Sequence, residues 1–428
     1  MKLEFFNAAD GDAFLASSGG RHLLVDGGRK GAFVENVLPR LDALRRRGEG
    51  LDAVCVSHID ADHITGILGL FELLIDWKVF DYHATIGNSA FPEPSRWRPP
   101  DVARVWHNGF EAQTGMDGRA PIRVLQRAAV VLAASDSGAI REAAESCGGI
   151  ATSISQGIEL ASQLEPGQLD IPCNPEFGGG SMVAEPGGAP LALGDALLTV
   201  LGPTREQLEA LKTQWETWVA ENRAAVDALL LDADRHGLAM ADVFFTRRAG
   251  QAAALADRTN VTVPNLASIM FLVREGARTA LLTGDGFGGD VVTALEAEGV
   301  LRQDAGLHVD VLKVPHHGSE HNSDHTFYER ITADHYVIPS DGSHHNPDNR
   351  VIDAIIGSRV GEGPSTAPTP QVGDPFTIWV TASTDGADST DRQHLRQIRE
   401  RISGWQRDHP ASVRAEFVAD ASFVLDLE

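Results

Sequence analysis

The sequence predicts an α/β protein, and two observations carry this prediction. Short apolar runs alternate with longer segments in which apolar residues recur every three or four positions, as in Ala32 to Arg47. Glycine-containing turns end several of the apolar runs, as at Gly19-Gly20 and at Gly284-Asp285-Gly286. With 428 residues, the chain could form two or three average domains, or one large α/β domain that carries an insertion.

The first 56 residues predict a β-rich start with one helix. Three strands are expected, at Leu3 to Asn7, Asp12 to Ser17 and Arg21 to Asp26. A helix is expected over Ala32 to Arg47, with Pro39 as a kink or a late start. Asp12 and Asp26 are interpreted as turn residues. Alternatively, Asp26 supports a neighbouring metal ligand from the end of its strand.

Next comes a stretch of metal-capable side chains at the junction of a buried strand and a helix. They are His58, Asp60, Asp62 and His63, after the apolar run Leu51 to Val56. Alternate residues of an extended segment share a side, so the first three can converge, and the fourth joins them if the helix begins there. Buried ionisable groups are costly unless they are paired or bind a metal. Imidazole and carboxylate together suit zinc, manganese or iron.

This HxDxDH pattern resembles the signature of the metallo-β-lactamase fold, whose commoner form is HxHxDH. Asp60 stands where the second histidine usually stands, which is similar to the ComEC-type competence proteins and their soluble hydrolase relatives. Two later stretches, Leu281 to Asp285 and Leu312 to Ser319, occur in the same order as in that family. The resemblance implies an αββα sandwich, here with a mainly helical insertion.

The resemblance also implies a centre that holds two divalent ions, zinc or manganese. The implied metal ligands are His58, Asp60, Asp62, His63, Asp285 and His317. One ion would be held by the first two with Asp285, and the other by the remaining ligands with Asp285 as the bridge. A hydroxide bridging the ions would be the nucleophile. Asp62 is therefore assigned to catalysis as well as to metal binding.

Further histidines are candidates for contacting the substrate or protonating a leaving group. Seven of the sixteen histidines lie between His316 and His345. His316, His344 and His345 are the candidates for this role. Relatives often carry His-Pro at the corner where this chain has Asn346-Pro347. The roles of His344 and His345 therefore stay open between substrate contact, ligand support and a place in a solvated loop.

A binuclear site of this family normally takes one more histidine between its first motif and the later aspartate. His83 and His107 are the candidates, with a structural histidine as the alternative for each. His83 falls in a strand expected at Lys78 to Ile86, and His107 ends a strand expected from Val102.

The motifs divide the chain into a first core half, residues 1–109, an insertion, residues 110–262, and a second core half, residues 263–428. The insertion is expected to be helical over Pro121 to Leu164, rich in glycine and proline over 167–190, and helical again from an N-cap at Thr204 to about Arg235. A returning core strand is expected near 191–203. Trp215 and Trp218 are interpreted as packing anchors, and the insertion as a lid, a substrate cap or a dimer contact.

The second core half predicts alternating strands and helices up to the last residues. The strands are expected at Met270 to Val273, Thr279 to Leu282, Val309 to Val314, Tyr336 to Pro339, Phe376 to Ser383 and Val413 to Leu427. The helices are expected at Asp290 to Glu298 and Arg392 to Arg407.

The composition limits where the protein is expected to act and which partners it is expected to bind. Three cysteines, an odd number, argue against a disulfide framework, and neither a signal peptide nor a membrane span is expected, so the protein is interpreted as cytoplasmic. The net charge of −24 is unlike that of proteins that hold nucleic acid unaided. A local basic stripe would still allow such binding.

Three functions are weighed. The first is a phosphodiesterase, with a nuclease acting on nucleic acid as the form that the resemblance implies. Soluble relatives also resemble effectors of bacterial defence modules that pair with a protease, so cutting of the segment 176–190 could open the site. The second is a hydrolase of small esters, lactams or thioesters on the same fold. The third is a metal-stabilised regulatory subunit without activity. Homo-oligomerisation is left open.

Overall fold

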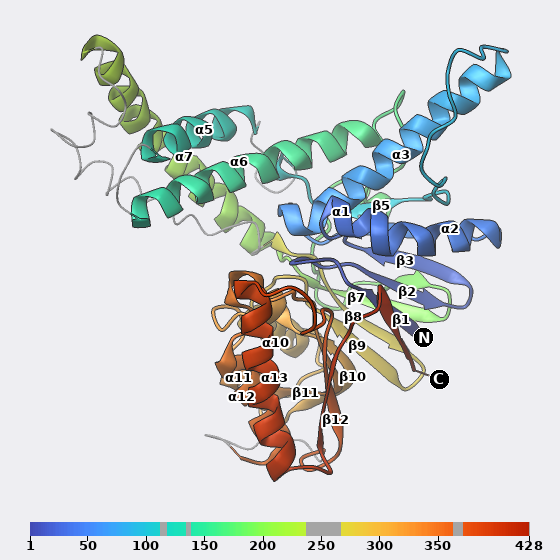
Figure 1. Cartoon of the computed structure of the whole chain (residues 1–428), viewed down its shortest axis with the longest axis vertical. Coiled ribbons are helices and arrows are strands. Elements are labelled where there is room, and N and C mark those ends of the chain that lie inside the picture. The colour runs from blue at the N-terminus through green and yellow to red at the C-terminus, as the bar shows by residue number, and fades with distance from the viewer. Residues whose placement is uncertain (112–117, 134–137, 237–266, 363–370, 428) are drawn as a thin grey trace.

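A computed structural model describes residues 1–111, 118–133, 138–236, 267–362 and 371–427. Two mixed β-sheets pack face to face, and helices cover the outer face of each sheet (Figure 1). The layers therefore run helix, sheet, sheet, helix, which is the α/β architecture that the sequence predicts. An apolar core drawn from both sheets, including Phe5, Leu23, Phe271 and Val311, fills the space between them.

The first sheet has the strand order β14-β1-β2-β3-β4-β5. Its strands are β1 (Lys2–Phe6), β2 (Phe14–Ser18), β3 (Arg21–Val25), β4 (Ala53–Val56), β5 (Val105–His107) and β14 (Ser422–Asp426). Its helices are α1 (Lys30–Ala32), the π-helical turn η1 (Phe33–Val37), α2 (Leu38–Arg46) and α3 (Ala61–Thr85). The irregularity expected at Pro39 is present, because the π-helical turn directly precedes the helix that contains this proline.

The second sheet has the strand order β13-β12-β11-β10-β9-β8-β7-β6. Its strands are β6 (Leu191–Leu193), β7 (Ala196–Gly202), β8 (Met270–Glu275), β9 (Arg278–Leu282), β10 (Leu307–Lys313), β11 (Ile331–Ile338), β12 (Phe376–Val380) and β13 (Val413–Phe417). Its helices are α10 (Gly288–Ala297), α11 (His325–Arg330), α12 (Asn349–Val360) and α13 (Thr390–Asp408). The β6–β7 hairpin is the returning core strand expected near 191–203, and it pairs with β8.

Parallel pairing brings the ends of distant strands together. Strands β9, β10 and β11 run parallel, so the segments that follow Leu282, Lys313 and Ile338 leave the sheet at one edge. In the first sheet β4 runs parallel to β5, so Val56 and His107 end side by side. Ligand sites of α/β proteins typically lie outside such carboxyl ends.

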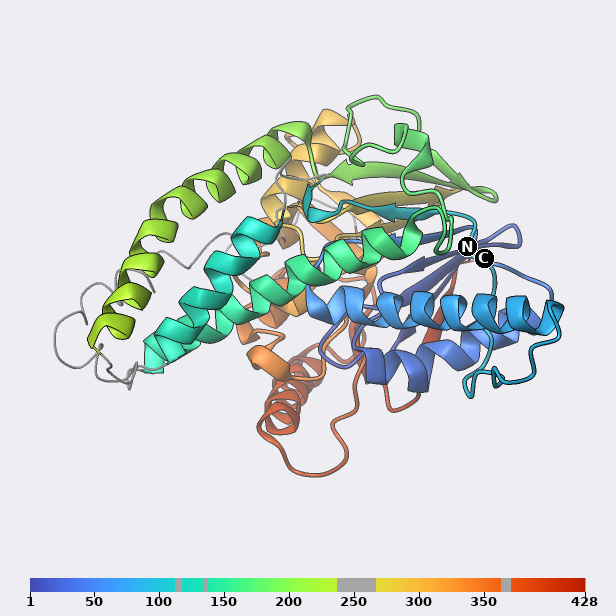
Figure 2. The ribbon, with the colours of Figure 1, turned by 90° about the horizontal axis from the view of Figure 1, so that it is seen from above.

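The helices of the predicted insertion form an arm with its own apolar core. They are α5 (Arg119–Ala133), α6 (Gly138–Leu164) and α7 (Arg205–His236). The arm extends to one side of the sandwich in both views (Figures 1 and 2). Trp215 and Trp218 are buried in this core, as expected of packing anchors. Thr204 caps α7 as predicted, because its hydroxyl accepts from the amide of Gln207 while the Gln207 side chain accepts from the amide of Thr204.

Residues 237–262, the end of the predicted insertion, lie outside the described ranges, so the boundary at 262 stays a prediction. Although α3, α6 and α7 are long, no helix within the described ranges has the apolar length needed to cross a bilayer.

Two expected strands are wrong. Lys78 to Ile86 belongs to α3, which continues to Thr85 because Trp77 is buried and packs edge-on against Phe80, one helical turn further along. Val413 to Leu427 is two strands: β13 pairs in parallel with β12 in the second sheet, and β14 pairs with β1 in the first. Alternation alone could not show that the chain changes sheets between them.

Candidate metal centre

Four histidines surround one carboxylate oxygen, Oδ2 of Asp285. Their Nε2 atoms lie at 3.3 Å for His63, 3.5 Å for His317, 3.7 Å for His58 and 3.7 Å for His316. Asp285 itself is 2% exposed. The loop after β4, the turn after β9 and the turn after β10 thus meet at the edge where their strands end, as the sequence predicts.

The ring nitrogens that face this oxygen fit metal ligation. Nε2 of His58, His63 and His317 is buried in each case and has no hydrogen-bond partner among the described residues. On the other side of the rings, Nδ1 of His63 donates to Asp26 Oδ2 at 2.9 Å and Nδ1 of His317 donates to the carbonyl of Pro339 at 2.7 Å. A histidine whose Nδ1 donates in this way presents a lone pair on Nε2, which is the form that binds metals.

The carboxylates of the HxDxDH motif lie on two sides of this cluster. Oδ2 of Asp62 is 3.2 Å from Nε2 of His317 and 3.4 Å from Nε2 of His63. Oδ2 of Asp60 is 3.7 Å from Nε2 of His58. The donors therefore fall into two groups that share Asp285, and a mixed nitrogen and oxygen donor set of this kind suits divalent transition ions.

Close backbone packing fixes the start of α3, which carries Asp62 and His63. The amide of Gly27 donates to the carbonyl of His63 at 2.9 Å, and the amide of Gly66 donates to the carbonyl of Gly28 at 2.9 Å. A Cβ on Gly66 would lie 2.0 Å from the carbonyl oxygen of Gly27, so only glycine permits this approach. The strand-to-helix turn is thereby held against the loop that follows Asp26.

The histidines after β10 sit on a strained turn. His316 and His317 have φ values of 44° and 53°, a left-handed region that costs non-glycine residues roughly 1–3 kcal/mol each. Hydrogen bonds hold the turn, since the amide of His316 donates to Gly284 and the amide of Asp348 donates to Gly318. The conformation directs both rings at Asp285, whereas the sequence predicted that one of the two is a ligand and favoured His317.

Asp12 and Lys313 were not assigned to the site from the sequence. Asp12 is fully buried and belongs to a cluster with His63, Asp285 and His317 whose ligand atoms lie within 4.8 Å of one another. Its Oδ2 lies 2.5 Å from Nζ of Lys313, and its Oδ1 lies 3.3 Å from Nδ1 of His317 rather than from Nε2. Asp12 is therefore paired with an ammonium behind the imidazoles. The available signal was a lysine at the buried end of β10, directly after the apolar Val311 and Leu312.

Charge coupling within the cluster shifts several pKa values. Burial alone would lower the pKa of His63, but Asp285, Asp62, Asp26 and Asp12 outweigh it and raise that pKa well above its ordinary value. The pKa of His317 is raised in the same way, chiefly by Asp285. Burial would raise the pKa of Asp62, yet His63 and His317 hold it well below the usual range. Without a metal, both histidines thus carry protons that an ion would replace.

Lys313 belongs to the same electrostatic balance. Burial opposes its charge, but Asp12 and Asp285 raise the pKa of its ammonium. In return, Lys313, His63 and His317 overcome the burial of Asp12 and lower its pKa to about 2. The centre therefore contains one permanent cation beside its carboxylates.

Of the two candidates for a further ligand, the structure brings His107 toward the centre and His83 away from it. His107 is 3% exposed at the end of β5, and neither ring nitrogen has a hydrogen-bond partner among the described residues. Burial lowers its pKa to about 4, so the ring is neutral near pH 7. His83 stacks on Phe91 near the end of α3, with ring centroids 4.1 Å apart.

His344 and His345 lie outside the buried cluster. Both are exposed on the turn η6 (Ser343–His345), with φ values of 55° and 62°. The ring of His345 lies 5.7 Å from that of His394 on α13. The loop that carries them begins with the Pro339 carbonyl that binds His317, so they border the site, and their roles in the reaction stay predictions.

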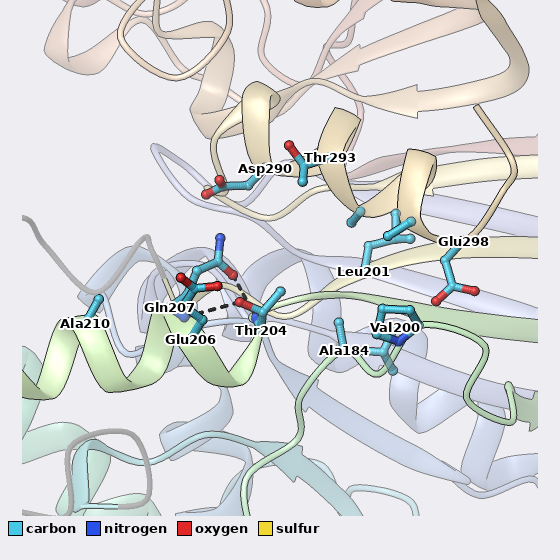
Figure 3. Close-up of a pocket in the computed structure, with 13 residues that line it drawn as sticks. Ala184, Val200, Leu201, Thr204, Glu206, Gln207, Ala210, Asp290, Thr293 and Glu298 are labelled. Carbon is cyan, nitrogen blue, oxygen red and sulfur yellow. Dashed lines mark hydrogen bonds between the residues drawn. The ribbon is translucent and has the colours of Figure 1, made fainter. Parts of the chain in front are cut away.

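Two cavities differ in how near their lining residues lie to the candidate centre along the chain. One of about 360 Å³ lies between α7, β7 and α10, and the carboxylates of Glu206, Asp290 and Glu298 are among its lining groups (Figure 3). Another, of about 810 Å³, is lined by the segment that follows the His316–His317 turn, including His321 and His325. The second is the one that adjoins the candidate centre along the chain.

The chain was compared with protein families, curated proteins and solved structures. Residues 7–119 match the family model described as the Metallo-beta-lactamase superfamily, whose members are mostly metal-dependent hydrolases. Among solved structures, the chain is similar to the metallo-beta-lactamase fold protein YhfI from Bacillus subtilis, with 11% identity, a TM-score of 0.34 and 100% of each chain covered. No curated protein matches the sequence. The residues that match the family model, 7–119, include the HxDxDH loop and His107, so the family likeness covers the segment that supplies the first donors of the centre.

Proposed function

We propose that the protein is a hydrolase that uses two divalent metal ions to cleave phosphodiesters, with nucleic acid as the favoured substrate. The observation that carries the proposal is the convergence of four imidazole Nε2 atoms on Oδ2 of Asp285, with Asp60 and Asp62 beside different members of the group. A shared carboxylate between two donor groups is the arrangement that two adjacent ions require.

One ion would be held by His58, Asp60 and Asp285, and the geometry adds His316 to this group. The other would be held by Asp62, His63, His317 and Asp285. When bound, such ions lower the pKa of water and polarise a phosphoryl oxygen. Because Asp60 supplies oxygen in place of the commoner histidine nitrogen, manganese competes with zinc for the site.

The protein's own groups orient these donors and border the reacting position. Asp26 and Pro339 fix the ring orientation of His63 and His317 through Nδ1. Arg29 is partly exposed and pairs with Asp10, which raises the pKa of its guanidinium, and Asp62 and Asp341 add to this effect. Arg29 therefore lies where an anionic substrate would approach. In this proposal His344 or His345, exposed on the bordering loop, protonates the leaving group.

Cleavage of single- and double-stranded DNA by purified protein in Mn²⁺ or Zn²⁺ tests this function directly. Wild-type protein should cleave only with metal, and the Asp62→Ala variant should be at least about 100-fold slower. Equal cleavage by the two proteins would assign the activity to a contaminant. No metal-dependent cleavage of either DNA or of bis-nitrophenyl phosphate would reject the phosphodiesterase.

Hydrolysis of small esters, lactams or thioesters is the second candidate. The net charge of −24 favours substrates that are not polyanions. The cavity of about 810 Å³ agrees with this, since Glu320, Asp324, Asp353 and Glu362 line it against one guanidinium, Arg350. Turnover of a chromogenic lactam or ester, with bis-nitrophenyl phosphate left intact, would favour this alternative.

A third candidate is a regulatory subunit whose metal site is inert. The presence of every donor of the HxDxDH motif together with Asp285 and His317 in one cluster, in which only Asp60 and Asp62 are half-exposed, argues for an active centre. Stoichiometric metal without turnover of any phosphodiester or ester would support the inert subunit.

A place in a bacterial defence module beside a protease remains part of the proposal, as do a cytoplasmic location and homo-oligomerisation. Within the segment 176–190, Met182 and Val183 are buried, whereas residues 185–190 are exposed and accessible to a protease. Limited proteolysis followed by the DNA assay tests this: if cutting at 185–190 leaves the rate unchanged, activation by cleavage is rejected.

A further inference from the structure

Ile59, the residue between His58 and Asp60, packs into the helical arm. It is fully buried, and it belongs to the apolar core of α5, α6 and α7 together with residues such as Ile154 and Trp215. Its neighbours on both sides in the chain are proposed ligands of one ion. The middle of the metal loop is therefore anchored in the arm rather than in either sheet.

Helix α6 offers a place shaped for this side chain. A buried apolar stripe at helical spacing runs along it, formed by Ile150, Ile154, Leu160 and Leu164. Gly157 lies within the stripe, is buried, and is the one position there without a side chain. A Cβ on Gly157 would lie 3.1 Å from Cγ2 and 3.8 Å from Cβ of Ile59. Ile59 thus occupies the gap that Gly157 leaves.

The arm also reaches the other half of the motif. Helix α6 packs against α3, whose first turn carries Asp62 and His63. Leu160 and Leu164 belong to the apolar core that lies beneath α3 with Ile64 and Ile67. One helix therefore contacts the loop of His58 and Asp60 through Gly157, and the helix of Asp62 and His63 through its last two turns.

We propose that Ile59 and Gly157 form a positioning pair through which the helical arm sets the separation of His58 and Asp60, and hence the affinity for the ion they hold. The proposal rests on the metal-dependent function proposed above. Ligand sets must be held within about 0.5 Å of their productive geometry. A methyl group at Gly157 would displace Ile59 by a few tenths of an ångström, and a larger side chain would displace it further.

Metal affinity of matched helix variants tests the pair. Gly157→Val is compared with Gly149→Val, which lies on the same helix and has no atom within 4 Å of its added Cβ among the described residues. Zn²⁺, and separately Mn²⁺, is titrated against a chromogenic chelator, and the melting temperature of each metal-free variant is recorded. Gly157→Val should raise the Kd of at least one ion by about 10–100-fold, the effect typical of groups that orient ligands. Gly149→Val should bind metal as the wild type does.

In the double variant, Ile59→Ala removes side-chain atoms at the place where Gly157→Val adds them. The crowding is relieved, so this variant should recover part of the metal affinity. A folded Gly157→Val protein with wild-type Kd overturns the proposal, as does an equal loss in Gly149→Val. If the wild type itself binds neither metal, both the proposed function and the Ile59–Gly157 pair are rejected. If the wild type binds metal and both variants bind it with the same Kd, only the pair is rejected.

Hydrogen exchange on the wild type decides the question should Gly157→Val not fold. Coupling is reciprocal, so metal added to the wild type should slow exchange in residues 150–164 of α6. Helix α13, on the outer face of the second sheet, serves as the internal control. Slowing confined to the HxDxDH loop, without an effect on α6, contradicts the proposal.

Discussion

Nζ of Lys313 lies 2.5 Å from Oδ2 of Asp12 in the interior, where the two side chains are 0% and 1% exposed. The same ammonium donates to the carbonyl of Gly284 at 2.7 Å and lies 3.5 Å from Oδ1 of Asp285. It thus binds the Asp285 oxygen that faces away from the imidazoles, and Oδ2 is left to face them.

Removing this cation should destabilise the protein strongly. Lys313→Met leaves two buried carboxylates without their partner, and breaking a buried pair typically costs about 3–5 kcal/mol. Urea unfolding of the metal-free protein measures the change. The double variant Asp12→Asn with Lys313→Met should lose less than the two single variants added together. Lys212→Met, which removes an exposed lysine 4.0 Å from Glu216, is the control and should change stability by less than about 1 kcal/mol. A similar small effect for Lys313→Met would contradict the pairing.

The metal-free protein should lose stability as the pH rises. The pKa values of His63 and His317 are raised by folding, so the stability they contribute is complete below their unfolded value, about 6.5, and is lost as the pH rises through the folded values. Bound Zn²⁺ replaces these protons and should remove the decline. Melting temperatures between about pH 5 and 9, with chelator and with Zn²⁺, show the difference. If the melting temperature changes with pH in the same way with chelator and with Zn²⁺, His63 and His317 are not protonated in the metal-free centre.

The opposite sign applies in acid. Folding lowers the pKa of Asp12 to about 2, so its contribution is complete above the unfolded value and is lost as the pH falls through the folded one. Its variant Asp12→Asn should therefore show a weaker dependence of unfolding free energy on pH between about pH 4 and 2 than the wild type. Identical slopes would remove Asp12 from the acid transition.

Asp26 should control metal affinity without being a ligand. Its Oδ2 accepts from Nδ1 of His63 and from the hydroxyl of Ser57, at 2.9 and 2.6 Å. Asp26→Asn keeps the left-handed backbone, φ 55°, because asparagine tolerates it. The Zn²⁺ Kd should rise by about 10–100-fold. Asp52→Asn, whose carboxylate accepts from Arg21 and His22, is the control. An unchanged Kd in both variants would deny Asp26 its orienting role.

Replacing His107 should affect metal binding, whereas replacing His83 should not. His107→Ala removes a buried neutral imidazole beside the end of β4, and we expect it to weaken or abolish binding of the ion assigned to His58. His83→Ala removes the stack on Phe91 and the hydrogen bond with Asn88, both at the far end of α3, and should leave stoichiometry and Kd as in the wild type. Elemental analysis after dialysis measures the metal stoichiometry, and competition with a chelator measures the Kd. Equal binding in both variants would assign His107 to packing.

Much of the centre could be predicted because it is encoded in short, local patterns. His58 to His63 follow a recognisable strand, and Asp285, His316 and His317 follow two more, so parallel pairing sufficed to bring them together. The αββα layering and the shared metal centre were expected because the HxDxDH motif and the two later stretches resemble the metallo-β-lactamase fold in content and order. The alternation of the strands and helices agreed with that resemblance but did not specify the layers.

What escaped prediction depends on contacts between distant segments. Asp12 resembles any turn aspartate until Lys313 is placed beside it from a different sheet. The left-handed turn that aims His316 is held by hydrogen bonds to Gly284 and Asp348, which local sequence cannot show. The strand expected at Lys78 to Ile86 failed because burial of Trp77 favours continued helix over local β-propensity. Residues 237–262 of the expected insertion lie outside the described part of the chain.

Strand β14 pairs with β1 in antiparallel register, Leu3 opposite Leu425, so β1, which pairs with the nearby β2 on one side, receives its second neighbour from a segment distant in the sequence. The donors at Asp285 and His317 also emerge from the ribosome long after those at His58 and His63. Until these later segments fold, one edge of the first sheet and half of the candidate donor set lack their partners. Contacts between such distant segments form slowly, so we expect the sheet and the candidate metal centre to be completed late in folding.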